Sequence, residues 1–321
     1  MNLRVSIQDA HFFGQDDSLA GIFARYGFEI VDSIAEADLV LGQTRRRLAA
    51  YTVRYPQKKF ALVAEDPRSE RTHAAFFRGP LGKRVHLLNV FSGEFYWDNY
   101  SYTNMLGVGE GALEVDIPAS HFKDPKREKA LCAMMAYSDH LYHDPAPPTG
   151  DNLHRLRRDL VESFEQDGFA DVSGRDWPKS SATEEDDFQA IGYHWADKKL
   201  EKFSRYWFGL SIENTLYPYY VTEKIWQSIV AGALPVYYGG GVSTIYDDFP
   251  ADSFVDVAQF ASTKSLLSYL RTITPEEAAQ RLSICRKAYN EMLKRKPASN
   301  DVYWQKATEN VCLRLRSLFK K

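Results

Sequence analysis

The chain lacks several features that would assign it to a class at once. It contains no run of eighteen apolar residues, and residues 1–13 alternate like a strand rather than reading as a signal sequence. Its three cysteines, Cys132, Cys285 and Cys312, lie far apart without a CxxC pair, which argues against a disulfide framework and a zinc site. Its 40 basic and 43 acidic residues are interspersed, so we expect no nucleic acid partner. These absences predict a soluble, cytoplasmic protein with reduced thiols.

The sequence does have the pattern of an α/β protein. Short apolar runs, each the length of a buried strand, alternate with amphipathic stretches. We expect strands at residues 3–7, 28–31, 38–42, 60–63, 85–92, 131–137, 170–175, 206–212, 234–238 and 253–257, and helices at 19–26, from 153, at 225–231, 275–296 and 302–321. This alternation predicts parallel sheets with helices on their faces. A length of 321 residues suits two domains.

The densest chemical pattern lies between residues 206 and 241. An apolar run at 206–212 ends at Glu213 and Asn214, and a second run at 234–238 ends in three glycines. Thr222 is the expected N-cap of the helix that connects them. Such a strand, helix and strand form a right-handed βαβ unit, whose polar residues gather at the carboxyl ends of the strands.

The first turn of that connecting helix carries Glu223 and Lys224. The helix dipole disfavours a lysine at this place, so Lys224 indicates that an anion lies opposite it. The alternative is that the two residues form an exposed ion pair on an ordinary amphipathic helix. Local pattern alone leaves both interpretations open.

These residues resemble the signature of glycosyltransferase family 10, the α-1,3/4-fucosyltransferases, in its bacterial form. The family motif runs Phe-Glu-Asn-Ser/Thr, a spacer, Tyr-Val-Thr-Glu-Lys, a helix, and a Val/Ile-Pro-Val/Ile strand ending in glycine. The chain has residues 212–215, 220–224 and 234–239 in the same order. It departs from the motif at Ile212, where the family has Phe, and by Pro218 in the spacer.

The resemblance implies an α/β fold of the GT-B type, with two Rossmann-like domains facing across a cleft. We expect an acceptor-binding domain at residues 1–125, a GDP-fucose-binding domain at 126–300 and a closing helix at 301–321. The implied activity is inverting transfer of L-fucose from GDP-β-L-fucose to an acceptor glycan, either N-acetylglucosamine of an N-acetyllactosamine unit or glucose of lactose. No metal or other cofactor is expected. The alternatives are a transferase of another GDP-sugar and a noncatalytic carbohydrate-binding protein of the same fold.

The resemblance also implies roles for single residues. Glu65, just after the strand at 60–63, would be the general base, although the family usually has Gly-Glu where this chain has Ala64-Glu65. The Gly93-Glu94 pair is the alternative. Arg157 and Lys224 would stabilise the leaving diphosphate. Arg157 is favoured by its register with the apolar face of its helix, and Arg155 is the alternative.

The remaining implied contacts concern the donor, the acceptor and the membrane. Asn214 and Glu223 would bond ribose or fucose hydroxyls, Tyr220 would contact the diphosphate or fucose, and Glu213 would orient the loop. The aromatic loop at residues 95–102 could either stack on an oligosaccharide acceptor or pack between domains. The basic and apolar segment 312–321 could touch the inner face of a membrane weakly, although a closing helix is the more economical interpretation. The implied product belongs to oligosaccharide or lipopolysaccharide biosynthesis, or to protein glycosylation.

Overall fold

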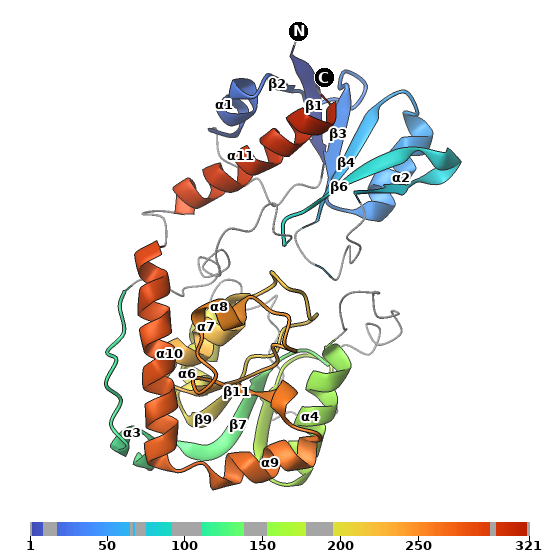
Figure 1. The fold of residues 1–321 in the computed structure, drawn as a ribbon. Coiled ribbons are helices and arrows are strands. Elements are labelled where there is room, and N and C mark those ends of the chain that lie inside the picture. Colours follow the sequence, from blue (N-terminus) through green and yellow to red (C-terminus); the bar gives the residue numbers. More distant parts are fainter. Residues whose placement is uncertain are drawn as a thin grey trace. The chain divides into compact units, whose positions relative to one another are not determined.

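The computed structural model describes residues 2–8, 18–64, 67, 75–91, 111–137, 153–177, 195–295 and 300–319 (Figure 1). By contacts the chain divides into two compact units. The first combines Met1–Trp97 with Pro297–Lys321, and the second is Asp98–Lys296. This division differs from the predicted boundaries at 125 and 300.

The first unit is built on a six-stranded sheet. Its strand order is β2-β1-β3-β4-β6-β5, and every neighbouring pair is parallel except β5 with β6. The strands are β1 (Leu3–Gln8), β2 (Phe28–Ile30), β3 (Leu39–Gly42), β4 (Lys59–Ala64), β5 (Phe76–Arg78) and β6 (Arg84–Asn89). Helices α1 (Ser18–Arg25) and α11 (Asn300–Phe319) lie together on one side, whereas α2 (Arg45–Arg54) contacts β3 and β4. A short 3-10 turn, η1 (Pro80–Gly82), packs on α2.

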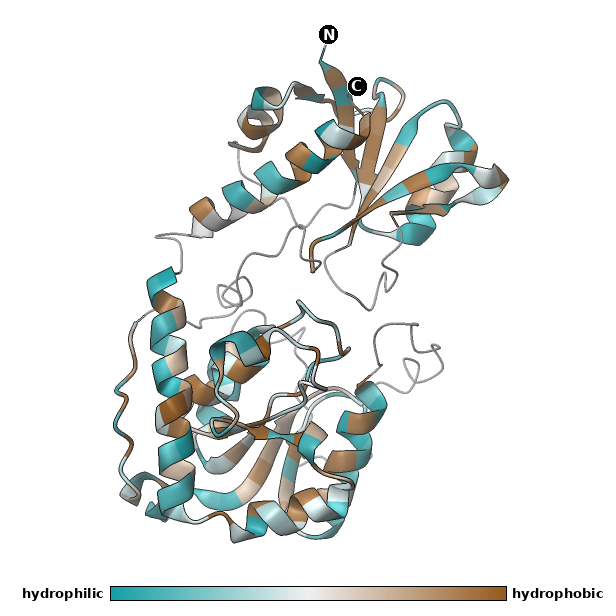
Figure 2. Cartoon of the chain, in the orientation of Figure 1, coloured by the Kyte–Doolittle hydropathy of each residue, from teal (hydrophilic) through white to brown (hydrophobic). Residues whose placement is uncertain are grey.

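Helix α11 completes the core of the first unit although it comes from the far end of the sequence. Figure 2 shows hydrophobic and hydrophilic residues alternating along it. Its buried apolar side chains, Ala307, Val311, Cys312 and Leu315, recur at helical spacing and pack in one cluster with residues of β1, β3 and β4. An ion pair between Arg25 of α1 and Glu309, 2.9 Å long, joins the two helices at the surface.

The second unit is built on a parallel five-stranded sheet with the order β11-β10-β9-β7-β8. Its strands are β7 (Glu128–Met134), β8 (Ala170–Ser173), β9 (Tyr206–Leu210), β10 (Leu234–Tyr237) and β11 (Val255–Asp256). Helices α4 (His154–Gln166) and α9 (Thr263–Thr272) pack together on one face, and α6 (Trp195–Phe203), α7 (Glu223–Val230) and α10 (Pro275–Arg295) pack on the other. Two short helices, α3 (Ser120–Lys123) and α8 (Ile245–Asp248), and the 3-10 turn η5 (Val257–Gln259) complete the unit.

The segment before β7 belongs to the second unit because α10 holds it. The Asn290 side chain accepts from the amide of Leu113 and donates to the carbonyl of Leu113, both at 2.8 Å. The Ser283 hydroxyl accepts from the amide of Ile117 at 3.1 Å. Contacts between α3 and α10 extend this attachment, which is why residues 111–123 pack with the second unit.

Each of the two units is built on a sheet that is parallel throughout or in all but one pair. This confirms the predicted α/β class with two Rossmann-like domains, which is the make-up of the GT-B type. The expected strands are present at or near their predicted positions, although the one expected at 253–257 is only Val255–Asp256. Helices α2, α6 and α9, the short helices α3 and α8, and strand β5 were not among the expected elements. Among the described residues, no helix is both long enough and apolar enough to cross a bilayer.

Candidate functional site

The carboxyl end of β9 and the start of α7 are held in direct contact. The Ser211 hydroxyl lies 2.7 Å from the Ser228 hydroxyl and donates to the carbonyl of Lys224 at 3.2 Å. Gly209 permits this approach, because a Cβ at this position would collide with Ser228 and with the ring of Phe203. The strand therefore fixes where the first turn of α7 lies.

A buried network around Glu213 organises that first turn. The Glu213 carboxylate accepts from the amide of Thr222 at 2.7 Å and from the Thr222 hydroxyl at 2.7 Å. The Lys224 ammonium donates to Glu213 Oε2 at 2.8 Å and to Thr222 Oγ1 at 2.7 Å. Thr222 occupies the predicted N-cap position, but its hydroxyl makes no capping bond because it is engaged between Glu213 and Lys224.

The pair of Glu223 and Lys224 is largely buried rather than exposed. Their side chains are 16% and 12% accessible, with Lys224 Nζ 3.4 Å from Glu223 Oε1, so the alternative of a solvated surface pair is wrong. Burial alone would lower the pKa of Lys224, but the carboxylates of Glu213 and Glu223 outweigh it and raise this pKa. Burial likewise opposes ionisation of Glu223, yet the nearby ammonium groups lower its pKa. Both groups are therefore ionised at neutral pH.

Helix α4 directs Arg157 toward the same loop. The buried Arg157 donates through Nη1 to Asn214 Oδ1 at 2.5 Å, and the carbonyl of Asn214 accepts from the amide of Leu153 at 3.0 Å. Arg157 lies on the buried face of α4 that the hydrophobic register predicted. The side chain of Arg155 is 77% accessible and pairs with Asp159. Of the two arginines, Arg157 is the one that reaches the loop after β9.

Lys199 of α6 belongs to this cluster, and sequence reasoning missed it. Its side chain is only 4% accessible and donates to Gln227 Oε1 of α7 at 2.7 Å. Burial lowers its pKa to about 8, and the charges of Lys224 and Arg157 act in the same direction. A signal was present, because Ala196, Lys199 and Phe203 share the spacing of one helix face. The surrounding charges of residues 197–202 made that face look solvated.

The cluster carries an excess of positive charge. Within the part of the chain that the structure describes, the electrostatic interactions of Lys199 and Lys224 join three cations, Arg157, Lys199 and Lys224, to two carboxylates, Glu213 and Glu223, which gives these five groups one net positive charge when all are ionised. Electrostatic interactions inside a protein are stronger than in water, so such an excess is costly unless an anion joins it. The arrangement at the carboxyl end of β9 is thus suited to bind a negatively charged group.

Sequence comparison identifies the protein family to which the chain belongs. The model described as glycosyltransferase family 10 (fucosyltransferase) C-term matches residues 153–317. The chain belongs to glycosyltransferase family 10. The matched region contains β9, α7, β10 and every residue of the cluster.

Relatives of this family 10 chain include two human proteins. One is 4-galactosyl-N-acetylglucosaminide 3-alpha-L-fucosyltransferase FUT6, and the other is 3-galactosyl-N-acetylglucosaminide 4-alpha-L-fucosyltransferase FUT3. Each is 40% identical over 80 residues, which cover 25% of this chain and 22% of the relative. The match thus spans about a fifth of the length of these relatives. A crystal structure of an alpha1,3-fucosyltransferase with GDP-fucose aligns over 100% of this chain and 91% of its own, with 16% identity and a TM-score of 0.43.

The glycine loop of the family 10 motif lies beside the network and is fixed by two side chains. Gly240 and Gly241 have φ values of 56° and 73°, which favour glycine. The Tyr246 hydroxyl accepts from the amide of Gly241 at 3.3 Å and donates to Asp256. The amide of Thr244 donates to the carbonyl of Pro218 at 2.7 Å, which ties the glycine loop to the spacer. The spacer ends at Tyr220, whose side chain is buried.

Several predicted positions lie outside the described residues. These are Glu65, the alternative pair Gly93-Glu94 and the aromatic loop at residues 95–102. Strand β4 ends at Ala64, the residue before Glu65. The assignment of the general base therefore stays a prediction.

No metal centre is formed by the side chains that the structure describes. Within these ranges no group of three or more His, Cys, Asp or Glu residues could hold an ion. Asp248, in an adjacent acidic pair with Asp247, bonds instead to Arg295 at 2.6 Å. The expectation that the chain requires no metal stays a prediction.

Proposed function

We propose that this family 10 chain is an inverting fucosyltransferase that moves L-fucose from GDP-β-L-fucose to a hydroxyl group of an acceptor glycan. Family membership supports the donor and the reaction class. The observation that carries the proposal is the buried cluster in which Lys224 and Arg157 converge on the loop between β9 and α7. Its positive excess complements a nucleoside diphosphate.

The donor would enter at the start of α7. The Lys224 ammonium already donates two hydrogen bonds, to Glu213 and Thr222, so its third N–H group could donate to a diphosphate oxygen. Glu223 contacts Lys224 only at 3.4 Å, and on donor binding it would turn to hydroxyls of ribose or fucose together with Asn214. Tyr220 would contact the diphosphate or the fucose. Glu213 would remain the fixed support of the loop.

The transfer needs a proton acceptor beside the attacking hydroxyl and positive charge beside the leaving diphosphate. The acceptor oxygen forms a bond to the anomeric carbon as the bond from that carbon to the diphosphate oxygen breaks. Negative charge then grows on the leaving diphosphate, where Arg157 and Lys224 would stabilise it. Glu65 would take the acceptor proton. Attack from the face opposite the leaving group inverts the anomeric centre, and the two cations would make a required metal unnecessary.

The acceptor proposed here is the N-acetylglucosamine of an N-acetyllactosamine unit or the glucose of lactose. The names of the two human relatives, which specify galactosyl-N-acetylglucosaminide acceptors, support this class. We place the reaction in the cytoplasm, within oligosaccharide or lipopolysaccharide synthesis. Incubation with GDP-fucose and each acceptor, followed by NMR of the product, tests the linkage and the anomeric configuration. Undiminished turnover in EDTA is expected.

The cationic clamp is tested by Lys224→Met, with Lys287→Met on the exposed surface of α10 as a matched control. Loss of a charge-assisted bond to the diphosphate should weaken GDP binding at least about tenfold, the equivalent of about 1.4 kcal/mol. Isothermal calorimetry with GDP measures this change. GDP affinity equal to that of the control would refute the assignment of Lys224.

The general base is tested by Glu65→Gln. Donor affinity should remain near that of the wild type, whereas turnover should fall at least ~10²-fold, because the amide cannot accept the proton. Calorimetry with GDP, GDP-fucose and GDP-mannose on the wild type separates the remaining alternatives. Preference for GDP-mannose would indicate another GDP-sugar transferase, and tight GDP-fucose binding without any turnover would indicate a noncatalytic binding protein.

A further inference from the structure

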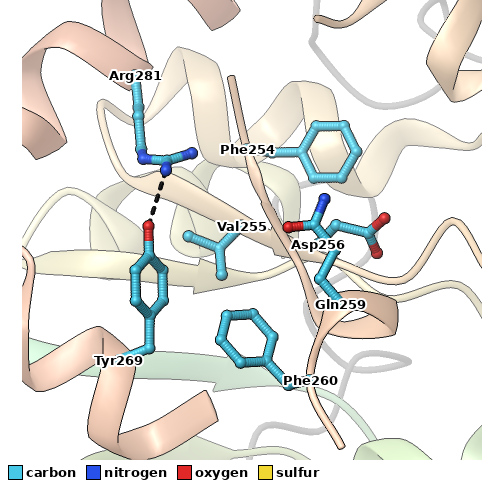
Figure 3. A pocket seen from close by; sticks show the side chains of 7 residues that line it. All are labelled: Phe254, Val255, Asp256, Gln259, Phe260, Tyr269 and Arg281. Carbon is cyan, nitrogen blue, oxygen red and sulfur yellow. Dashed lines mark hydrogen bonds between the residues drawn. The ribbon is translucent and has the colours of Figure 1, made fainter. Parts of the chain in front are cut away.

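A hollow in the Asp98–Lys296 unit lies beside the edge strand β11. It encloses about 270 Å³ and is lined by Phe254, Val255, Asp256, Gln259, Phe260, Tyr269 and Arg281 (Figure 3). These residues come from β11, η5, α9 and α10 and the chain between them. None of them was assigned above to the donor. The size is at the small end of ligand pockets, which suits one small molecule rather than a nucleotide or an oligosaccharide.

The polar side of this hollow is rigid. Arg281 donates through Nε to Glu277 at 3.0 Å and through Nη2 to the Tyr269 hydroxyl at 2.7 Å. The same hydroxyl donates to Glu277 at 2.9 Å, which closes a triangle of bonds. Figure 3 shows the guanidinium and the Gln259 amide at the edge of the space between the rings. Within the described parts of the chain, neither Arg281 Nη1 nor the Gln259 amide has a hydrogen bond, so both can serve a ligand.

The apolar side is formed by aromatic rings that already contact each other. The rings of Phe260 and Tyr269 have centroids 5.2 Å apart at an interplanar angle of 38°. They leave no slot between them in which a planar nucleobase could stack. They instead present a bent aromatic surface, with Val255 of the edge strand and Phe254 completing the wall (Figure 3). Such a surface next to directed hydrogen-bond donors fits the C–H face and the hydroxyls of a pyranose.

The charge of the hollow excludes anionic ligands. Of the residues that the structure describes, Asp256 lines the hollow and Glu277 is paired with the lining residue Arg281, so these two carboxylates and one guanidinium leave one net negative charge. Asp256 cannot move aside, because it accepts from Tyr246, from the amide of Ala258 at 3.0 Å and from the amide of Gly239 at 3.4 Å. A phosphate or a sugar acid would be repelled, whereas a neutral sugar would not.

We propose that this hollow binds one neutral sugar unit, with Gln259 and Arg281 bonding its hydroxyls and with Phe260 and Tyr269 packed against its apolar face. The residues that line this hollow differ from those assigned to the donor, and a sugar could bind there whether or not the chain is a transferase. The hollow adds a second carbohydrate contact to the unit.

The experiment uses the full chain with saturating GDP and methyl β-glycosides of galactose, glucose and N-acetylglucosamine as probes. Saturation-transfer NMR titrations compare the wild type with Gln259→Ala and Phe260→Ala, and with Gln305→Ala on the exposed side of α11 as control. Gln259 is exposed, so its replacement should leave the fold intact. We expect at least one neutral glycoside to bind, with affinity reduced about fivefold or more in both pocket variants and unchanged in the control. Methyl β-glucuronide should bind more weakly than the glucoside.

Two results would overturn the proposal. One is the absence of binding by every neutral glycoside, and the other is binding that is the same in Gln259→Ala and Phe260→Ala as in the wild type. Tighter binding of the glucuronide would refute the charge argument and with it the ligand class. GDP affinity, measured by calorimetry on the same samples, should not change in either variant. Failure of GDP to bind the wild type would count against the donor site alone.

Discussion

Lys199 and Lys224 lie in the same buried cluster, yet their pKa values move in opposite directions. Lys224 has two carboxylates within 3.4 Å, which raise its pKa despite burial. Lys199 has the neutral amide of Gln227 as a bonded partner at 2.7 Å, so burial dominates and lowers its pKa to about 8. Lys199 is therefore the cation of the site that can lose its proton under mildly alkaline conditions.

This difference predicts a pH-dependent stability for Lys199→Met. Above pH 8 the unfolded wild-type chain keeps a proton on Lys199 that the native chain releases, so the stability of the wild type rises with pH toward the unfolded pKa of 10.5. The variant lacks this gain, which amounts to about 3 kcal/mol at most. The free energy of unfolding of wild type minus variant should therefore increase from pH 7 to pH 10. Denaturant titrations at both pH values measure it, and a difference that stays constant would contradict the prediction.

Sequence patterns predicted single residues well where one helix face decides their environment. The apolar register of α4 identified Arg157 as the inward arginine, because its neighbours on that face are all buried. The same method failed for Lys199, whose bonded partner comes from another helix, 28 positions away in the sequence. It also gave Thr222 its N-cap position but not the bonds of its hydroxyl, which depend on Glu213. The periodicity of a helix predicts whether a side chain faces the core or the solvent, but it does not predict which side chains of other elements it contacts.

Among the secondary-structure elements, strands with continuous apolar sequences were predicted closely. Strands β3 and β4 are buried along almost their whole length, so the pattern was unambiguous. Helix α2 was missed because only Leu48 and Thr52 of its ten residues are buried. The attachment of residues 111–117 to α10 could not be predicted, since Leu113 and Asn290 are 177 positions apart.

Two leucines of helix α11 provide a test of whether its apolar face belongs to the core of the first unit. Leu315→Ala should destabilise the first unit by about 2–5 kcal/mol, because Leu315 is fully buried in its core. Leu313→Ala is the matched control on the same helix, since Leu313 is 51% exposed and its loss should change stability by about 0.5 kcal/mol or less. Thermal and denaturant unfolding compare the two. Equal effects would mean that the apolar stripe of α11 does not form part of the core.

The burial of the apolar face of α11 also decides whether this helix is available to bind a membrane surface. The apolar stripe of α11 that could enter a lipid surface is already occupied by the core of the first unit. Among the described residues 312–319, the exposed ones are Leu313, Arg316 and Ser317, which is little for interfacial binding. We therefore favour the closing-helix role over weak association with the inner membrane face. Flotation with vesicles rich in anionic lipid should leave the protein in the bottom fraction.

The chain as a whole consists of two units that each enclose a core, so a ligand that binds one unit should protect that unit first. GDP at 100 times its Kd should stabilise the second unit by about 2.7 kcal/mol. Hydrogen exchange monitored by mass spectrometry should then slow in β9, α7 and β10, with a much smaller change in β1, β3 and α11. Equal slowing in both units would contradict the assignment of the donor to the second unit.

The first unit is discontinuous in the sequence, which has a consequence for synthesis on the ribosome. Met1–Trp97 is translated early, but the helix that seals it arrives with Pro297–Lys321. The second unit lies between these two segments in the sequence, so it is translated before that helix. The sheet of the first unit is therefore made before the helix that covers its apolar side. During this interval β1 and its neighbours are the surface that a chaperone would recognise.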